Sequence, residues 1–577
     1  MNALALIGLT FFGYLLAYHT YGKFLSEKIF RLNPKAVVPS IQHEDGEDFV
    51  PTEKSVIFGH HFTSIAGTGP IVGPAIGVIW GWVPAMVWIF FGSIFMGAVH
   101  DFSALVISLR NEGKSISDVT GKYINSRVRT MFFGVVFLGL LIVIAIFGLV
   151  ISIIFARFPN SVIPIWLEIP IALGLGFAVY KKGGNLKKFT FFAKILMLGT
   201  IMIGYWVPLS LPSVFGIPAT GIWTILLLTY AYFASTLPVT TLLQPRDYLN
   251  AWQLYFVLAL LVSGIVASFF MVDLTIPAPA LQLSPEGAPP MWPFLFITIA
   301  CGAVSGFHCL VCSGTSSKQV KNEMDAKFIG YGSMLLEAAL ATLVIVSVTA
   351  GIGLSYLTDS GEVLSGISAW QAHYSSWTSS AGLGSKLDAF VIGASNFIHA
   401  LGIPMALCIV VMGVFVASFA ATTLDSATRI QRYVITELFQ NTRFSWLSTK
   451  RRAAGFAVLS AAGLAFSSGA DGKGALMLWP LFGAVNQLLA ALALMVATVY
   501  LKKKSGRAWI ITGIPCVFML SMTLWATVIH QLQFFASRNI LLSIINLVIG
   551  GLAIAMVSET LAVFVFGVKS KPVKAGG

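Results

Sequence analysis

Residues 59–74 of the sequence, GHHFTSIAGTGPIVGP, combine side chains that can carry a proton with residues that interrupt a helix. His60 and His61 lie in an otherwise apolar stretch, and a histidine ring changes its charge near neutral pH. Glycine and proline between 67 and 74 disfavour a continuous helix, because glycine loses backbone entropy and proline lacks an amide hydrogen. We therefore predict a broken membrane helix, with close packing of continuous helices through glycine as the alternative.

A broken helix has unpaired amide groups at the start of its second half, where a solute can bind. We expect the amides that follow Gly67 to do this, with His61 as a further donor or a proton carrier. Adjacent residues on a helix point about 100° apart, so the alternative is that one of the two histidines only braces the bundle. The predicted substrate-binding residues are His61, Thr63, Ala66, Gly67, Thr68 and Gly69, together with Ser235, Thr236 and Thr240.

Transporters with internal repeats carry a second interrupted segment, and two later stretches are candidates. Residues 233–250, FASTLPVTTLLQPRDYLN, combine two prolines with a run of hydroxyl side chains. Residues 305–319, SGFHCLVCSGTSSKQ, repeat the spacing HxxxxxGT that His61 begins in the first segment, here beginning at His308. The shared spacing fixes too few positions to establish a duplication.

Ionisable side chains at membrane depth are costly, and they mark an ion pathway or a buried pair. Asp101, His308 and Glu337 lie in apolar stretches, and together with His61 they are predicted ion-coupling residues. For each of the two carboxylates, a proton relay and a purely structural role both remain open. Lys194 is expected to extend toward the inner membrane surface.

A hydroxyl-rich segment at 419–433, FAATTLDSATRIQRY, ends a predicted span with Asp425 and Arg429 one helical turn apart. Such a pair is either a simple structural ion pair or part of an inner gate. The predicted gate residues are Arg246, Asp247, Asp425 and Arg429.

Cys301, His308 and Cys312 would share one face if their segment were a continuous helix, and they could hold zinc or copper. Ligands from a single helix rarely complete a tetrahedron, and cysteine is a common packing residue in membrane cores. The sequence therefore predicts neither a metal nor a cofactor.

The composition predicts a polytopic membrane protein. Of the 577 residues, 57% are hydrophobic and 10% are charged, and the mean hydropathy is +0.85, whereas soluble domains carry about 25% charged residues. Apolar runs predict about fifteen transmembrane helices. The segments between them are too short for a soluble catalytic, nucleic-acid-binding or protein-binding domain, so we expect no enzyme activity. The expected partners are a small-molecule substrate and the lipid bilayer.

The basic residues orient the chain in the membrane. Most of the 36 lysine and arginine residues fall in alternate loops, and the intervening loops hold only Arg157, Lys386, Lys473 and Arg538. Because basic residues collect on the cytoplasmic side, this distribution places the N-terminus outside and the C-terminus in the cytoplasm.

The motifs above, together with AVHDF, LLQPRDYLN, TTLDSATR and LWPLFGAVNQLLAALAL, resemble the carbon starvation (CstA) family of bacterial inner-membrane transporters. Residues 67–92 are also similar to the first core helices of the sodium:alanine symporters. These resemblances imply an all-α fold of the amino-acid/polyamine/organocation superfamily, with a LeuT-like inverted-repeat core and discontinuous helices. They also imply uptake of small carbon sources during starvation: pyruvate or a similar small carboxylate, or short peptides, with proton coupling.

On this resemblance, spans 55–79, 221–243 and 291–315 are the first, sixth and eighth core helices, and the first and sixth are the broken pair. The fold further implies a cation between the first and eighth helices, so Ser313, Thr315 and Ser316 join the predicted ion-coupling residues as oxygen ligands. Either H⁺ or Na⁺ could then be the coupling ion. The alternatives are a Na⁺-coupled amino-acid or peptide symporter, a starvation sensor, and a metal-binding membrane protein using the Cys301, His308 and Cys312 face.

Four regions follow from these expectations: an extra N-terminal transmembrane helix (1–22), a cytoplasmic loop (23–54), a LeuT-like transport core (55–425), and additional C-terminal transmembrane helices with a short cytoplasmic tail (426–577).

Overall fold

The computed structural model describes residues 2–272, 274–358, 360–377, 382–440 and 442–566. Within these ranges the chain is mainly helical, with one short hairpin in which β1 (Tyr356–Leu357) pairs antiparallel with β2 (Val363–Leu364). The end of the predicted cytoplasmic tail, 567–577, lies outside the described residues.

The helices of the first half are α1 (Ala3–His19), α2 (Tyr21–Phe24), α3 (Pro39–Gln42), α4 (Lys54–Ile65), α5 (Gly69–Gly77), α6 (Trp82–Gly92), α7 (Ala98–Leu109), α8 (Ile116–Tyr123), α9 (Ser126–Arg157), α10 (Val162–Gly176), α11 (Leu186–Trp206), α12 (Ala219–Thr236) and α13 (Leu243–Met271). Those of the second half are α14 (Met291–Thr298), α15 (Gly306–Gly314), α16 (Ser333–Val346), α17 (Gly366–Tyr374), α19 (Leu383–His399), α20 (Met405–Phe439), α21 (Lys450–Ala465), α22 (Trp479–Ser505), α23 (Ile510–Ala536) and α24 (Ile540–Phe566).

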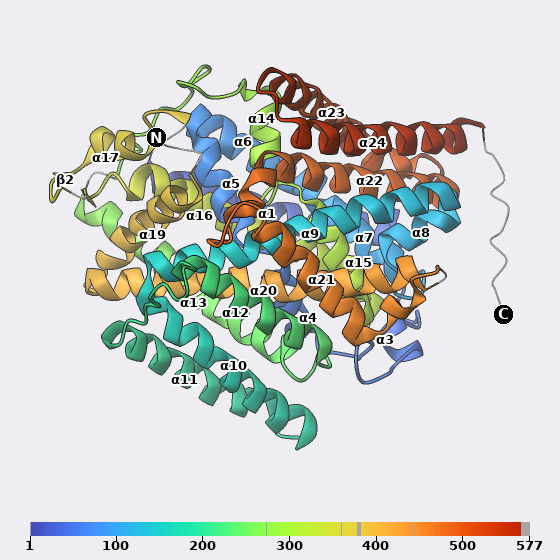
Figure 1. Ribbon diagram of the computed structural model, residues 1–577, viewed down its shortest axis with the longest axis horizontal. Coiled ribbons are helices and arrows are strands. Elements are labelled where there is room, and N and C mark those ends of the chain that lie inside the picture. The colour runs from blue at the N-terminus through green and yellow to red at the C-terminus, as the bar shows by residue number, and fades with distance from the viewer. Residues whose placement is uncertain (1, 273, 359, 378–381, 441, 567–577) are drawn as a thin grey trace.

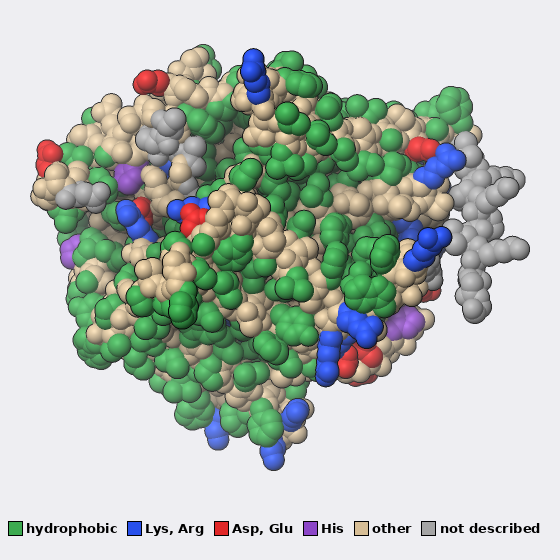
Figure 2. Space-filling model, viewed as in Figure 1, with side chains coloured by type: hydrophobic (Ala, Val, Ile, Leu, Met, Phe, Trp, Pro, Cys, Tyr) green, Lys and Arg blue, Asp and Glu red, His purple; other side chains and the backbone are tan. Residues whose placement is uncertain are grey.

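The fold is that of a multi-span membrane protein, as predicted. In the described part of the chain, 11 helices are long and apolar enough to cross a membrane, or up to 12 if a bent pair counts as one span. The predicted number of about fifteen stays a prediction. Figure 2 shows hydrophobic side chains over much of the visible face, with few charged ones among them.

The predicted first break is present between α4 and α5, which are bent by 44° relative to each other. Ala66 leaves helical geometry at φ −80° and ψ 46°, and α5 restarts at Gly69 with Pro70 in its first turn. Glycine is required here by close approach. A Cβ atom on Gly67 would lie 2.3 Å from Thr423 Oγ1, and one on Gly69 would lie 2.4 Å from Cys301 Sγ.

The second interruption lies elsewhere than predicted. Span 221–243 is not a broken helix: α12 ends at Thr236, and a short turn joins it to the separate long helix α13. The interrupted segment is instead 291–314, which lies in the span 291–315 that the resemblance assigns as the eighth core helix and overlaps the other candidate segment, 305–319. There α14 ends at Thr298 and α15 begins only at Gly306.

The two interrupted helices have matching surroundings. Helix α13 packs along α4 and α22 packs along α15, while α16 packs against α5 and α7 packs against α15. The long helices α9 and α20 pack on each other. Each interrupted helix therefore packs against a helix that follows the other interrupted helix in the chain: α16 follows α15 and packs on α5, and α7 follows α5 and packs on α15. This arrangement agrees with an inverted repeat. Figure 1 shows α10 and α11 at one edge of this core and α23 and α24 at the opposite edge.

Candidate functional site

A cavity of about 650 Å³ lies beside both interruptions. Its wall includes Gly67, Thr68 and Gly69 of the first break and Cys301 of the second. Further lining residues are Val143 and Phe147 of α9, Phe294 of α14, Phe307 of α15, Thr423 of α20, Asn486 of α22, and His530, Gln533 and Phe534 of α23.

The cavity wall is mainly apolar and carries no Asp, Glu, Lys or Arg side chain among its described residues. Helix α5 begins at this wall, and its first amide groups have no preceding helical turn to bond with. Pro70 has no amide hydrogen, so Thr68 and Gly69 are the donors closest to the break. The wall therefore offers hydrogen-bond donors and the positive end of a helix without a competing carboxylate.

Three of the predicted ion-coupling residues meet in one buried group, contributed by α7, α15 and α16. His308 Nδ1 lies 2.9 Å from Asp101 Oδ2, and His308 Nε2 lies 3.2 Å from Glu337 Oε2. His100 Nδ1 adds a contact of 2.7 Å to the other oxygen of Asp101. These three side chains and His100 are fully buried. We call Asp101, His308 and Glu337 the buried triad.

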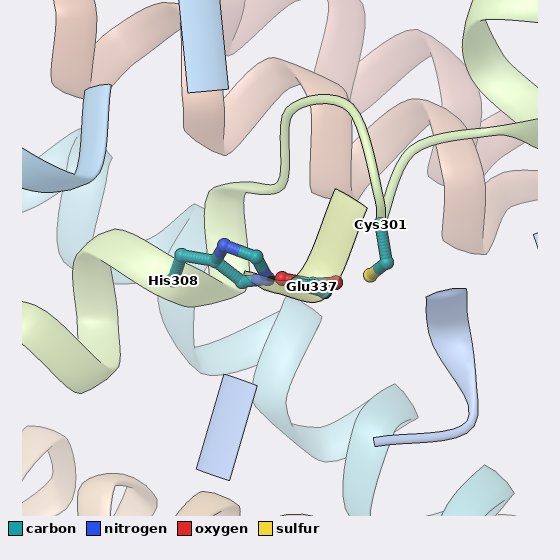
Figure 3. A group of neighbouring side chains, drawn as sticks. All are labelled: Cys301, His308 and Glu337. Carbon is teal, nitrogen blue, oxygen red and sulfur yellow. Dashed lines mark ion pairs between the residues drawn. The ribbon is translucent and has the colours of Figure 1, made fainter. Parts of the chain in front are cut away.

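The buried triad is linked to the cavity through Gly302. The amide of Gly302 donates to Glu337 Oε1 at 3.0 Å, and its neighbour Cys301 lines the cavity. Figure 3 shows the Glu337 carboxylate between the His308 ring and the Cys301 thiol. A ring nitrogen of His308, a carboxylate oxygen of Glu337 and the Cys301 sulfur all lie within 4.8 Å of one another. Both ring nitrogens of His308 face carboxylate oxygens, so a ring protonated on both nitrogens would have a carboxylate partner on each side.

The predicted cysteine and histidine face is not formed. Cys301 lies in the link before α15, whereas Cys312 lies on the helix with its sulfur 3.9 Å from His61 Nε2. The expectation failed because it assumed one continuous helix through 301–312.

The histidine pair does not line the cavity. His60 Nδ1 lies 2.5 Å from Asp247 Oδ2 of α13, and His61 Nδ1 lies 2.7 Å from Ser316 Oγ just after α15. Both rings therefore connect the first half of the broken helix, α4, to neighbouring segments.

The predicted pairing of Asp425 with Arg429 is wrong. Asp425 Oδ2 lies 2.5 Å from Arg246 Nη1 and accepts a hydrogen bond of 2.8 Å from the Tyr230 hydroxyl. Arg246 also bonds Glu168 Oε1 at 2.8 Å, and Glu168 is not among the predicted site residues. Arg429 pairs with Asp48 instead of Asp425, because a buried charge pairs with the opposite charge that the fold brings closest.

Arg429 is bonded to the loop before α4. Its Nη1 lies 2.8 Å from Asp48 Oδ1, and Arg432 Nη2 lies 3.2 Å from Asp48 Oδ2. Burial raises the pKa of Asp48, but the charges of Arg429 and Arg432 outweigh it and lower the pKa to about 2.

The same loop makes backbone contacts on both sides of Asp48. Val239, in the turn between α12 and α13, donates its amide to Glu47 O at 2.9 Å, and Val50 donates to Lys318 O at 3.1 Å. We call residues 45–52 the strap, since they join this turn to the segment that follows α15.

The remaining predicted hydroxyls lie away from the cavity wall. Ser235 and Thr236 bond carbonyls of their own helix α12, and Thr240 lies in the turn beside the strap. Ser313 and Thr315 likewise bond carbonyls of α15 and do not face the first break. Among the predicted substrate-binding residues, Gly67, Thr68 and Gly69 line the cavity, whereas His61, Thr63 and Ala66 lie behind it.

The hydroxyls that contact the end of α4, just before the first break, come from α20 and not, as predicted, from α15. Thr422 Oγ1 donates to Thr63 O at 3.0 Å, and Thr423 Oγ1 donates to Ser64 O at 3.3 Å. Ser426 Oγ lies 2.8 Å from Ser64 Oγ. The sequence motif TTLDS carried this signal, but from the sequence we interpret it only as a structural ion pair or part of an inner gate.

Fold and site together define a class: a multi-span membrane transporter with a LeuT-like core and discontinuous helices. A solved mutant of the manganese transporter of Eremococcus coleocola matches the fold with a TM-score of 0.51 at 10% sequence identity, covering 90% of this chain and 98% of that one.

Within that class, the chain belongs to the carbon starvation protein CstA family, whose model matches residues 2–526. It is 34% identical over 560 residues to the peptide transporter CstA of Campylobacter jejuni, covering 89% of this chain and 78% of that protein. It is also 32% identical over 585 residues to the pyruvate/proton symporter BtsT of Escherichia coli, covering 89% of this chain and 79% of that protein.

Proposed function

We propose that the protein imports a small carboxylate such as pyruvate, or short peptides, through the 650 Å³ cavity by alternating access. The observation that carries the proposal is the start of α5 in the cavity wall, where amide donors face a space with no charged side chain among the described lining residues. A carboxylate there gains hydrogen bonds and the favourable end of the helix dipole. The names of the CstA and BtsT relatives agree with both substrate classes.

We assign proton coupling to the buried triad. Two carboxylates flank one imidazolium there, so the fully ionised group holds one negative charge away from water. Adding a proton to Glu337 neutralises this charge and weakens the bond that its carboxylate accepts from Gly302. Because Cys301 lines the cavity, protonation is transmitted to the wall that contacts the solute.

Alternating access requires that the inner side be closed while the outer side is open. The strap supports this arrangement, because Asp48 holds Arg429 and Arg432 of α20 on the side that we expect, from the basic loops, to be cytoplasmic. The cavity wall also includes 287–290 of the loop between α13 and α14, which the same orientation places outside. Opening toward the cytoplasm would require the strap to release α20.

Reconstituted transport tests the proposal. Purified protein in liposomes is given labelled pyruvate or a labelled dipeptide under a pH gradient alone, a Na⁺ gradient alone, or neither gradient. We expect accumulation of at least one solute only under the pH gradient. Accumulation under the Na⁺ gradient alone would favour the Na⁺-coupled alternative, and equal uptake in all three conditions would contradict coupling.

A further inference from the structure

A groove on the outside of the helix bundle lies between α4, α13 and the π-helical segment Lys327–Gly332, and it measures about 860 Å³. Aromatic rings form much of its wall: Phe58 of α4, Tyr248, Trp252 and Tyr255 of α13, and Phe328. Lys54 and Lys321 lie at its basic rim.

A second hollow of about 390 Å³ continues from this groove, since Trp252 and Tyr255 line both. It lies between α11 and α13, and its wall is almost entirely apolar, including Met197, Ile201 and Phe256. Trp252 and Phe256 are 40% and 47% exposed, so the hollow opens on the surface of the helix bundle. The two hollows together offer an apolar channel that begins at a basic rim.

Lys194 lies in the apolar hollow with its Nζ atom 3.2 Å from the centre of the Trp252 ring. In the described part of the chain no carboxylate pairs with it. A cation at membrane depth is costly unless a negative group lies near it. The π face of the Trp252 ring supplies the negative potential here, so Lys194 adds positive charge to the channel without a carboxylate beside it.

The charges around the groove leave a positive excess. Glu53 lies at the rim, and Asp325 lies 3.6 Å from Lys54, so these two carboxylates oppose Lys54, Lys321 and Lys194. The Lys54 side chain is 51% exposed and keeps donors free for a second partner. The orientation from basic loops places this rim at the cytoplasmic surface, where anionic lipids attract lysine.

We propose that this groove binds one anionic phospholipid, with its phosphate at Lys54 and Lys321 and an acyl chain passing Trp252 into the hollow beside Lys194. The chemistry of the ligand is a negative headgroup attached to a long apolar chain, which matches the order of basic rim and apolar channel. A free phosphate would leave the apolar hollow unfilled.

The bound lipid would brace α4 against α13. These helices already pack closely, since a Cβ atom on Gly59 would lie 3.2 Å from the Ala251 Cβ atom. Helix α4 is the first half of the broken helix, so a lipid that contacts both helices stabilises its present position. Lipid binding itself does not depend on the proposed solute, whereas an effect on transport would rest on the proposed function.

Lipid retention tests the site. The full-length protein is equilibrated with equal amounts of phosphatidylglycerol and phosphatidylcholine, and the bound lipid is counted by native mass spectrometry. We expect the wild type to retain phosphatidylglycerol, and Lys54→Gln with Lys321→Gln to weaken this retention roughly thirtyfold, since each of the two lysines near a membrane surface contributes about 1 kcal/mol. The matched control is Lys187→Gln with Lys188→Gln, two exposed lysines outside the groove. Equal retention of both lipids, or equal loss in the control, would overturn the proposal.

A spectroscopic measurement locates the lipid without depending on how well the lysine variants fold. Brominated phosphatidylglycerol should quench tryptophan fluorescence more than brominated phosphatidylcholine, and Trp252→Phe should remove most of this difference. A difference that persists in Trp252→Phe would place the lipid elsewhere and contradict the site.

Discussion

The amide of Gly302 donates a hydrogen bond of 3.0 Å to the carboxylate of Glu337, and this bond joins the buried triad to the cavity wall. Gly302 has φ of +88°, a conformation that favours glycine, so the link between α14 and α15 is shaped to present this amide. The bond gives a direct structural route by which the charge of Glu337 can alter the cavity.

Replacing Glu337 with glutamine should separate solute binding from proton coupling. The amide keeps the shape of the side chain but cannot gain or lose a proton, so accumulation under a pH gradient should fall at least tenfold while exchange of labelled for unlabelled solute continues. Uptake and counterflow in the same liposomes measure both. The control is Glu362→Gln at the exposed hairpin. Undiminished accumulation in Glu337→Gln would exclude this residue from coupling.

Gly67→Ala should close the first break against α20. The new Cβ atom would lie 2.3 Å from Thr423 Oγ1 and 3.0 Å from Phe147, so crowding should cost about 1–3 kcal/mol of stability and abolish solute binding. Thermal unfolding with and without solute measures both effects. Gly134→Ala in α9 is the control, because nothing lies within 4 Å of its Cβ position. If Gly67→Ala binds solute normally, the break is not the site.

Asp48→Asn should weaken the contact between the strap and α20 in a pH-dependent way. The pKa of Asp48 is lowered from 3.8 to about 2 in the folded protein, so ionised Asp48 contributes about 2 kcal/mol of stability above pH 4. This contribution is lost as the pH falls from about 4 toward 2, because the carboxylate then becomes protonated in both states. The stability difference between wild type and variant should therefore be present at pH 7 and shrink at acid pH. A difference independent of pH would show that the ion pairs with Arg429 and Arg432 are not its cause.

His530→Phe should weaken solute binding without disturbing the packing of α23. The ring lies against Phe294 and Phe534, and its Nδ1 atom is buried at the cavity without a hydrogen-bond partner among the described residues. Losing one hydrogen bond to the solute should raise the KM roughly tenfold. The control on the same helix is Trp525→Phe, at an exposed position away from the cavity. An unchanged KM in His530→Phe would remove this ring from solute recognition.

The sequence by itself determined the membrane class and the first break. Both are local properties: a long apolar run must lie in lipid, and the glycines and prolines around Gly67 interrupt a helix wherever they stand. The buried ionisable residues of the triad could also be predicted, because a charge at membrane depth is unusual in any context.

Only the tertiary structure decided where the second break falls. Residues 299–305 carry little local signal, and side chains from other helices hold the freed backbone groups. Glu337 accepts from Gly302, Asn486 accepts from the amide of Phe307 at 2.9 Å, and Trp88 donates to the carbonyl of Ile299 at 2.9 Å. Of the prolines at 233–250, by contrast, Pro238 lies in the turn between two separate helices and Pro245 lies in the first turn of α13.

Tertiary structure also decided the partners of the charges. Asp425 and Arg429 are one turn apart in the sequence, yet each bonds to a residue far along the chain, Arg246 and Asp48 respectively. Sequence spacing establishes which charges could pair along one helix, but burial favours the pairing that satisfies every charge at once. That choice depends on how α13, α20 and the strap pack together, which local sequence does not encode.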